Sequence, residues 1–584
     1  METAKLEKIV VCYSELGIRF VSLFPPFRFS RPLLNGRMFN LVIMKKIQSI
    51  IVLGLALTLS AFVSNGQSRG FKLGQWTEIQ NSVLRQLSLS YVDSLDVDRI
   101  MRAGIDAMLA QLDPYTIYVP EEENEDFRMM LSNTYGGIGA VVHKENGGYV
   151  IINEPYEDSP AAKNGLQCGD EILEIDGADP RPLEISEATD RMKGKPGTKV
   201  HFKIKKVRSG DIVDVDIVRE RIQIPSVDYV GMLDSGTGYI RQTKFTENVS
   251  SEIRKAYQEL KAQGMTRLIL DLRGNGGGLM EEAVNIVSLF VPKGSLVVTS
   301  KGIAEQAREM RTRTEPVDVD IPLYVMIDSN SASASEIVSG SLQDMDRATI
   351  LGQRSYGKGL VQSIRPVAYN GQLKVTTAKY YTPSGRCVQA IDYAHRNEDG
   401  SVGHIPDSLT HEFKTASGRI VRDGGGITPD VEIKAPSYSR IVSALVLYGV
   451  IDKYAIEFAR KHASIPAVED FHLSDEDFED FVSFAKTREF DYRSSAKASF
   501  DQMKSEMAKD GLSDAVKEQL DIIEKALLIE KEQFIRLKKD EIVPFIEEEI
   551  AVRYYFQKAG VKVRLRYDTE VSDVLKYIHN QPQE

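Results

Sequence analysis

A run of small residues at 329–336 contains the hydroxyl groups around which we expect the chemistry of this chain. The preceding run at 322–328, PLYVMID, is short and rich in bulky residues, which predicts a buried strand, and the apolar spacing of 337–344 suits a helix. Where a strand turns into a helix, backbone N–H groups are unpaired and the helix dipole favours negative charge. A serine hydroxyl at this turn could therefore attack a carbonyl while the neighbouring N–H groups hold the developing oxyanion.

A hydroxyl nucleophile needs a base, and the sequence offers a lysine in place of a histidine. The segment 202–394 contains no histidine, so a Ser-His-Asp arrangement would have to borrow one from outside this region. Lys358 lies between Gly357 and Gly359, after a second strand-like run at 348–352. A lysine can act as a base if burial or a neighbouring cation lowers its pKa toward neutrality. A lysine held by glycines between apolar strands could meet that condition.

Three simpler interpretations compete with this one. Ser333 and Glu336 fit the S-x-x-E capping box, so Ser333 could merely begin a helix. Gly352, Gly357 and Lys358 match the front of a phosphate-binding P-loop, but a glycine follows where Ser or Thr should reach magnesium, and the next run favours a strand over the required helix. Lys358 could also be a solvated turn lysine, the default for an isolated lysine.

A resemblance to a known family favours the catalytic interpretation of Ser333 and Lys358 over the three simpler ones. The pattern SASASE at 331–336, followed by YGKG at 356–359 and then Val361-Gln362, resembles the signature of the C-terminal processing peptidases, or tail-specific proteases, of serine peptidase family S41. The resemblance implies that Ser333 is the nucleophile, that Lys358, 25 positions later, is the general base, and that Gln362 orients Lys358. It also implies an α/β core of the crotonase/ClpP-like serine protease type, which works without ATP, cofactor or metal ion.

A glycine run supplies candidates for the oxyanion donors. The strand-like run at 267–273 ends in Gly-Asn-Gly-Gly-Gly at 274–278 and leads into a predicted helix. Such a turn could cradle a phosphate, yet the glycines are spaced too closely for G-x-G-x-x-G. DLRGNGGG is similar to the D-L-R-x-N-x-G-G of the same family, whose glycine gives one oxyanion N–H. The resemblance implies this role for Gly277, with Gly278 as a close rival, and assigns the second donor to Ala334.

The segment 132–220 is similar to a PDZ domain. Its glycine-rich start, YGGIGA at 135–140, is followed by SPAAKNGLQCGDEILEIDG at 159–177, a long match to the PDZ pattern. Consecutive N–H groups of a glycine-rich turn can bind the terminal carboxylate of a peptide that adds to the sheet as an extra strand. The resemblance assigns this carboxylate site to Gly137, Ile138, Gly139 and Ala140. Alternatively, these glycines simply form a tight hairpin.

Composition and charge narrow the function classes. The 584 residues are enough for three to five domains of ordinary globular composition, and the formal net charge is -11. Residues 1–66 contain eight Lys or Arg and three acids, so the negative charge belongs to the remainder. An acidic body argues against nucleic acid as a partner. Protein or peptide substrates, bound by their C-termini, are the expected partners.

The first 66 residues predict a leader. Met44 and two lysines precede an apolar run at 47–63 and small or polar residues at 64–67, which is typical of a secretory signal. Because such signals begin a chain, we expect translation to start at Met44 and residues 1–43 to come from an over-extended gene model. An uncleaved anchor is the alternative, although the run is shorter than the roughly 20 residues that a membrane span prefers. The expected location is the periplasm, with or without anchoring to the inner membrane.

The rest of the chain divides into further regions. Apolar residues at helical spacing predict an N-terminal helical region at 70–131, and the residues at 221–436 form the expected S41 core. From 437 to 584 the composition changes to helix formers and charge, and the family resemblance does not extend to this tail. An apolar seam at 516–537, under four heptads long, favours a packed helical subdomain over a coiled coil. These helices could join two copies of the chain in a homo-oligomer.

We therefore expect an exported serine endopeptidase that recognises C-terminal tails through its PDZ domain and cleaves them by a Ser-Lys mechanism. The main alternative is an inactive PDZ scaffold with a degenerate protease core, although such a core has no need to keep Ser333, Lys358 and Gln362 together. An acyl-CoA enzyme of the crotonase type would share the fold, but it has no reason to carry a PDZ domain or a signal peptide.

Overall fold

The computed structural model describes residues 70–581, apart from 145–146, 304–305, 398, 491, 493–494, 513–515 and 528–530. The predicted leader, including the signal peptide at 44–66, lies outside the described residues. The chain divides into two compact units, and their boundary between Arg102 and Ala103 falls within helix α3 (Val97–Leu109). In the first unit, the described residues form a helix at 70–90 and the first part of α3.

The segment that follows α3 departs from the helical prediction for 70–131. It contains the short helical turn η1 (Glu121–Glu123) and helix α4 (Asn124–Ser132), but also strand β1 (Ile117–Val119), which pairs with β17 (Gln372–Tyr381) of the core. Pro114 and Pro120 flank β1, and a helix cannot continue through either residue without losing a hydrogen bond. The prediction was wrong for this strand, which belongs to a core sheet.

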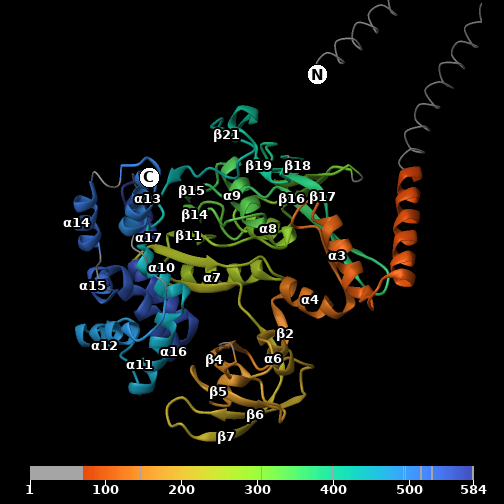
Figure 1. Cartoon of the computed structure of the whole chain (residues 1–584). Coiled ribbons are helices and arrows are strands. Elements are labelled where there is room, and N and C mark those ends of the chain that lie inside the picture. The colour runs from red at the N-terminus through yellow and green to blue at the C-terminus, as the bar shows by residue number, and fades with distance from the viewer. Residues whose placement is uncertain are drawn as a thin grey trace, which may run out of the picture. The chain divides into compact units, whose positions relative to one another are not determined.

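The predicted PDZ segment forms an antiparallel sheet in the order β3-β4-β5-β6-β7 (Figure 1). Its apolar side chains, among them Ile152, Ile172 and Phe202, are fully buried beneath helix α6. Strand β3 lies at the edge of this sheet, and β2 pairs separately with β8. The elements are β2 (Thr134–Gly137), β3 (Ala140–Lys144), β4 (Val150–Pro155), α5 (Pro160–Lys163), β5 (Glu171–Ile175), α6 (Ile185–Met192), β6 (Lys199–Lys205), β7 (Ile212–Val218) and β8 (Glu220–Gln223).

The core is built on a six-stranded sheet in the order β22-β15-β14-β11-β10-β9. Only the β9–β10 pair is antiparallel; the other neighbours run parallel, so the ends of β11, β14 and β15 meet at one edge. Loops that follow parallel strands at such an edge commonly form the active site. The strands are β9 (Val227–Met232), β10 (Thr237–Gln242), β11 (Arg267–Asp271), β14 (Leu323–Ile327), β15 (Thr349–Gly352) and β22 (Val431–Glu432).

Alternate side chains of β11 face opposite sides of this sheet. Leu268 and Leu270 belong to the main apolar core with the helices α7 (Val249–Ala262), α8 (Met280–Val287) and α9 (Ala334–Asp344). Ile269 packs on the other face, against Val571 and Val574 of α17 (Thr569–His579). The sheet is therefore covered on both faces, which explains why its strands are apolar throughout.

A second sheet and two hairpins complete the core. The sheet has the order β1-β17-β12-β13, and β16 pairs with β17 beside it. Its remaining strands are β12 (Leu296–Lys301), β13 (Arg308–Arg311) and β16 (Leu360–Pro366). The hairpins pair β18 (Ile391–Arg396) with β19 (Val402–His404), and β20 (Glu412–Lys414) with β21 (Ile420–Arg422). The short helical turn η2 (Asp407–Leu409) lies between them.

The tail is helical, as predicted from its composition. The apolar seam expected at 516–537 is divided between two separate helices, α14 and α15. The long helix α16 bends at Tyr555 and Phe556, where the backbone leaves helical geometry. The helices are α10 (Arg440–Leu447), α11 (Val450–Lys461), α12 (Asp475–Lys486), α13 (Ser495–Lys509), α14 (Lys517–Leu527), α15 (Lys531–Leu537), α16 (Lys539–Tyr567) and α17.

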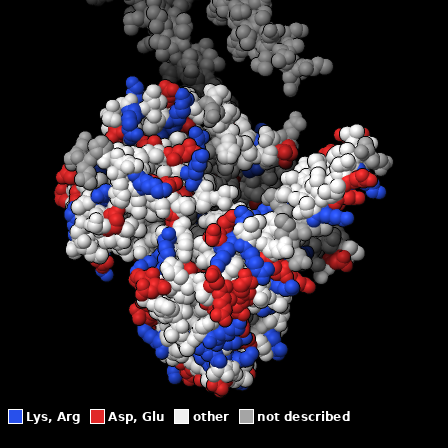
Figure 2. Space-filling view, turned by 90° about the vertical axis from the view of Figure 1, so that its left-hand side faces the viewer, with Lys and Arg blue, Asp and Glu red and all other residues white. Residues whose placement is uncertain are grey.

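On the face shown in Figure 2, basic and acidic side chains gather in small neighbouring patches. Cross-strand ion pairs also occur on the PDZ sheet, where Lys203 lies 2.8 Å from Glu174. Among the described helices, none combines the length and the apolar character that crossing a membrane requires. The described residues also include no cluster of three or more His, Cys, Asp or Glu side chains suited to a metal ion.

Candidate active site

Ser333 lies at the turn between β14 and α9, in a backbone conformation that is rare for a residue with a side chain. Its φ is +56° and its ψ is −110°, and it is the N-cap residue of α9. Its carbonyl accepts hydrogen bonds from the backbone N–H groups of Glu336 and Ile337, each at 2.9 Å, and from Tyr380 Oη at 3.1 Å. Strained backbone of this kind persists only where surrounding contacts enforce it, and it is common at active sites.

Glu336 is a fully buried carboxylate that joins the Ser333 and Lys358 loops. Its Oε1 accepts hydrogen bonds from Ser355 Oγ at 2.6 Å and from the Gly357 N–H at 2.7 Å. Its Oε2 accepts the N–H groups of Ser333 and Lys358, each at 2.8 Å. Burial raises the pKa of Glu336, and these four hydrogen bonds act in the opposite direction. The capping-box pattern identified this residue, but its contacts with the second loop were not expected.

The Lys358 side chain lies over an aromatic ring from the segment before the PDZ domain. Its Nζ is 4.2 Å from the centre of the Tyr115 ring. Burial, with the neighbouring charge of Lys374, lowers the pKa of Lys358 to about 8, against the opposing effects of Glu336 and Asp113. About one tenth of the amine is therefore uncharged at pH 7, and the uncharged form is the one that a general base requires.

Among the described residues, no side-chain hydrogen bond joins Gln362, Lys358 and Ser333 to one another. Gln362 Nε2 donates to Thr376 Oγ1 at 3.1 Å, on the neighbouring strand β17. Within the described part of the chain, no hydrogen bond joins Lys358 Nζ to Ser333 Oγ or to Gln362. The structure thus brings the Ser333 and Lys358 loops together through Glu336 but leaves the Lys358 amine beside Tyr115. Catalytic hydrogen bonds often form fully only when substrate binds.

Gly277 packs directly against the start of α9. Its φ is +96°, and an added side-chain carbon would lie 2.8 Å from Ser333 Cβ and 2.9 Å from the Ala334 nitrogen. Only glycine fits this contact, because both the conformation and the space exclude a side chain. The Gly277 N–H, however, donates to Asn275 Oδ1 at 3.0 Å.

The backbone N–H groups of Gly276, Gly278 and Ala334 remain available. None of the three donates a hydrogen bond to any residue that the structure describes. Asn275, whose role the sequence did not reveal, is buried and fixes the loop, because its carbonyl accepts the Ala332 N–H at 3.0 Å. Of Gly277 and Gly278, only Gly278 thus has an N–H group without an acceptor among the described residues, while Gly277 supplies the close contact with Ser333. The oxyanion role of either glycine stays a prediction.

Comparison with known proteins identifies the family of the chain. The model for peptidase family S41 matches residues 236–394, and a PDZ domain model matches 151–206. A carboxy-terminal-processing protease of Bartonella bacilliformis is 35% identical over 347 residues, which is 59% of this chain and 77% of that protein. The chain belongs to the carboxy-terminal-processing proteases of peptidase family S41. It is thus a protease, and the predicted family and fold class are confirmed.

Further known proteins are similar to this S41 protease. The carboxy-terminal processing protease CtpA of Bacillus subtilis is 31% identical over 326 residues, 56% of this chain and 68% of that protein. Among solved structures, the photosystem II D1 C-terminal processing protease is 25% identical and covers 60% of this chain and 86% of its own, with a TM-score of 0.34.

The comparisons also correct one expectation about the C-terminal tail. A model described as the C-terminal helical domain of a probable PDZ-protease matches residues 441–578. The family resemblance therefore reaches the tail, contrary to the prediction. The three matched ranges lie inside the domains predicted at 132–220, 221–436 and 437–584, whose limits stay predictions.

The predicted carboxylate site of the protease lies where the PDZ sheet begins. Gly137 ends β2 and Ala140 begins β3, with Ile138 and Gly139 between them. The carbonyls of Ile138 and Gly139 accept the N–H groups of Ala161 and Tyr156, at 2.8 and 2.9 Å. These two carbonyls are thus bonded within the domain. Because β3 is the edge strand, a peptide could add beside it.

Proposed function

We propose that the protein is an exported, ATP-independent endopeptidase that cleaves proteins by a Ser-Lys mechanism. Ser333 attacks the peptide carbonyl, Lys358 takes the hydroxyl proton and later gives it to the leaving amine, and Gln362 orients Lys358. The observation that supports this most is the sharing of Glu336 Oε2 by the Ser333 and Lys358 N–H groups, which fixes the two loops together.

For catalysis, the Lys358 amine leaves the face of Tyr115 and reaches the Ser333 hydroxyl. A cation over an exposed or half-buried ring is stabilised by only about 0.5–2 kcal/mol, so substrate binding can offset the loss of this contact. The uncharged amine, which abstracts the proton, has still less attraction to the ring. Deprotonation and release from Tyr115 therefore favour each other.

The PDZ domain supplies substrate recognition in this proposal. The terminal carboxylate of a client binds at Gly137, Ile138, Gly139 and Ala140, and its last residues extend β3. The open edge of β3 supports this assignment. Cleavage then takes place in a polypeptide whose end is held on the same enzyme, which raises its effective concentration at Ser333.

Export, membrane association and self-association complete the proposal. The basic start and apolar run of residues 44–66 support secretion to the periplasm, with or without retention at the inner membrane. The exposed apolar side chains on α14, Ile522 and Ile523, support contact between C-terminal helices of two copies.

The test uses one unfolded protein substrate prepared with a free and with an amidated C-terminus. We expect the amidated form to be cleaved with a KM at least roughly tenfold higher, because a PDZ carboxylate site cannot bind an amide as an anion. Ser333→Ala should cleave neither form. Equal KM values for the two forms would remove tail recognition from the proposal, and cleavage by Ser333→Ala would remove the nucleophile.

A further inference from the structure

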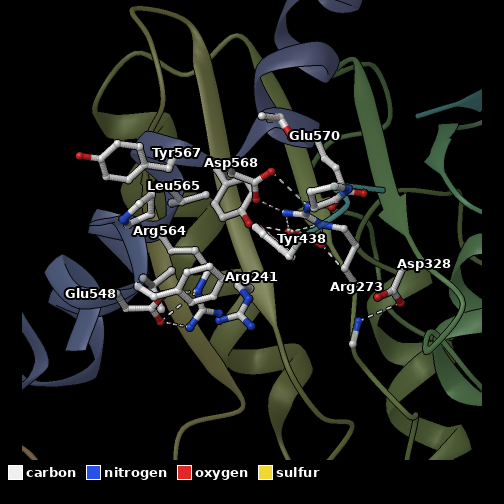
Figure 3. Close-up of a pocket in the computed structure, with 18 residues that line it drawn as sticks. Arg241, Arg273, Asp328, Tyr438, Glu548, Arg564, Leu565, Tyr567, Asp568 and Glu570 are labelled. Atoms are coloured by element: carbon white, nitrogen blue, oxygen red, sulfur yellow. Dashed lines mark hydrogen bonds and ion pairs between the residues drawn. The ribbon is translucent and has the colours of Figure 1, made fainter. Parts of the chain in front are cut away.

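The first turn of α17 contacts the strand that leads to the oxyanion loop. Figure 3 shows Asp568 and Glu570 directed at the guanidinium of Arg273. Arg273 Nη2 donates to Asp568 Oδ2 at 2.8 Å, and Nη1 donates to Glu570 Oε2 at 2.9 Å. On its other side, the same guanidinium is bound to both oxygens of Asp271 at the end of β11. The C-terminal helical domain and the protease core therefore share one arginine.

Arg273 immediately precedes the glycine run that approaches Ser333. The next residue, Gly274, donates its N–H to Asp328 Oδ1 at 2.9 Å, and Asp328 also accepts the Ser331 N–H at 3.0 Å. The position of the guanidinium thus determines where the oxyanion loop begins and how it meets the loop that carries Ser333. A small shift of this anchor would displace the Gly277 contact with Ser333.

The second oxygen of Glu570 contacts the other catalytic loop. Gln353 Nε2 donates to Glu570 Oε1 at 2.6 Å and to the Ile433 carbonyl at 2.8 Å. Gln353 directly follows β15, at the start of the loop that carries Lys358. One carboxylate from α17 therefore connects the oxyanion loop, through Arg273, with the loop of the base, through Gln353.

Apolar contacts already hold α17 on the sheet. Val571, Val574 and Ile578 are buried against β10, β11, β14 and β15. Burying carboxylates and a guanidinium beside such contacts gives little net stability, because desolvation offsets much of the attraction. The charged cluster lies at the end of α17 that faces the loops, and its contribution there is to fix their position.

We infer that Glu570 is a positioning residue for catalysis, which makes the geometry of the oxyanion and Lys358 loops depend on docking of the C-terminal helical domain. This inference rests on the proposed Ser333 and Lys358 mechanism. It predicts that weakening the contact lowers the rate of acylation without changing substrate affinity, since the PDZ domain is untouched.

The test compares Glu570→Gln with Glu548→Gln. Glu548 pairs with Arg564 near the same cavity, both within α16, and makes no hydrogen bond or ion pair with either catalytic loop among the described residues. The two carboxylate side chains are similarly shielded, at 11% and 15% exposure. Steady-state kinetics and the rate of labelling by a small fluorophosphonate probe are measured for both, with thermal unfolding as a check of folding.

We expect Glu570→Gln to lower kcat and the labelling rate roughly tenfold or more at unchanged KM, because small displacements of catalytic groups have large kinetic effects. Glu548→Gln should stay within about twofold of wild type in both. Equal behaviour of the two variants would overturn the inference. If Glu570→Gln does not fold, the same measurements are made on Gln353→Leu. A kcat of this variant within twofold of wild type then overturns the inference. Wild-type labelling anywhere other than Ser333 would instead refute the proposed function, so the two failures are distinguishable.

Discussion

The backbone N–H groups of Ser333 and Lys358 donate to the same atom, Oε2 of Glu336, each at 2.8 Å. The loops after β14 and β15 are therefore fixed to each other through one buried carboxylate. The main chains of the proposed nucleophile and base are held in place, whereas no hydrogen bond among the described residues fixes the Lys358 amine, which lies over the Tyr115 ring. The proposed mechanism needs this amine to move to Ser333.

Replacing Glu336 by glutamine should weaken both the fold and the activity. All four partners of Glu336 donate, so an amide would place its own N–H₂ group against two of them. We expect a loss of about 1–3 kcal/mol in the free energy of unfolding, measured by urea denaturation. Activity should fall at least roughly tenfold, because both loops lose their common anchor.

The exposed Glu281 of α8 provides the matched control for that experiment. Glu281→Gln should stay within about 0.5 kcal/mol of wild type. If Glu336→Gln were as stable and as active as this control, the shared carboxylate would not hold the site together.

The pH dependence of kcat/KM should follow the ionisation of Lys358. Its pKa is lowered to about 8, and only the uncharged amine accepts a proton. Activity should therefore rise tenfold per pH unit below about 8 and level off above it. Since the charge of Lys374 contributes to the lowered pKa, Lys374→Met should raise the pKa of Lys358 and move the rising limb to higher pH.

Lys379 lies on the same strand, β17, but is exposed, and Lys379→Met serves as the control. Its pH profile should coincide with that of wild type. A limb that moves to lower pH in Lys374→Met, or does not move, would exclude Lys358 as the titrating base.

Alanine substitutions at Gly277 and at its neighbour Gly276 provide a matched comparison. Gly277→Ala would force a methyl group to within 3 Å of Ser333 Cβ and the Ala334 nitrogen at a φ of +96°. An added carbon at Gly276 meets nothing within 4 Å. We expect Gly277→Ala to lower kcat by about 10²-fold or more, because the methyl group would displace Ser333 and the predicted oxyanion donor Ala334, and Gly276→Ala to be nearly neutral. Similar kcat values for the two variants would contradict the assigned contact.

Two glycines of the PDZ domain provide a similar comparison for the proposed carboxylate site. At Gly139, with a φ of +74°, an added carbon would lie 2.5 Å from Ser159 Cβ, whereas Gly147, with a φ of +72°, has open space. Both substitutions carry the same backbone cost, but only Gly139→Ala disturbs the proposed carboxylate site. We expect it to raise KM for a tail-bearing protein at least roughly fivefold while kcat is kept. An unchanged KM would argue that tails bind elsewhere.

Several features of the site followed from local pattern. The strand, small-residue turn and helix around Ser333 are specified by apolar spacing within about twenty residues, and the structure has them as β14 and α9. The sequence also pointed to Gly357, because it and Gly359 flank Lys358. The φ of Gly357 is +88°, so the Lys358 turn needs glycine at this position.

Contacts between distant segments could not be predicted in this way. Tyr115 contacts Lys358, and Glu570 contacts Arg273, from which it is separated by 297 positions in the sequence. The periodicity of apolar residues carries no information on which distant segments are neighbours in the fold. Strand β1 has only three residues, too few for an alternating pattern to be distinguished from a helix end. The Asn275 hydrogen bond that occupies the Gly277 N–H depends on one side-chain orientation, which no spacing specifies.

The most direct test of the central claim is labelling by a fluorophosphonate, followed by intact-mass analysis and peptide mapping, in wild type, Ser333→Ala and Lys358→Ala. We expect one adduct on Ser333 in wild type, none in Ser333→Ala, and labelling slowed at least about 10³-fold in a normally folded Lys358→Ala. Labelling of Lys358→Ala at close to the wild-type rate, or an adduct on another residue, would contradict the Ser-Lys mechanism.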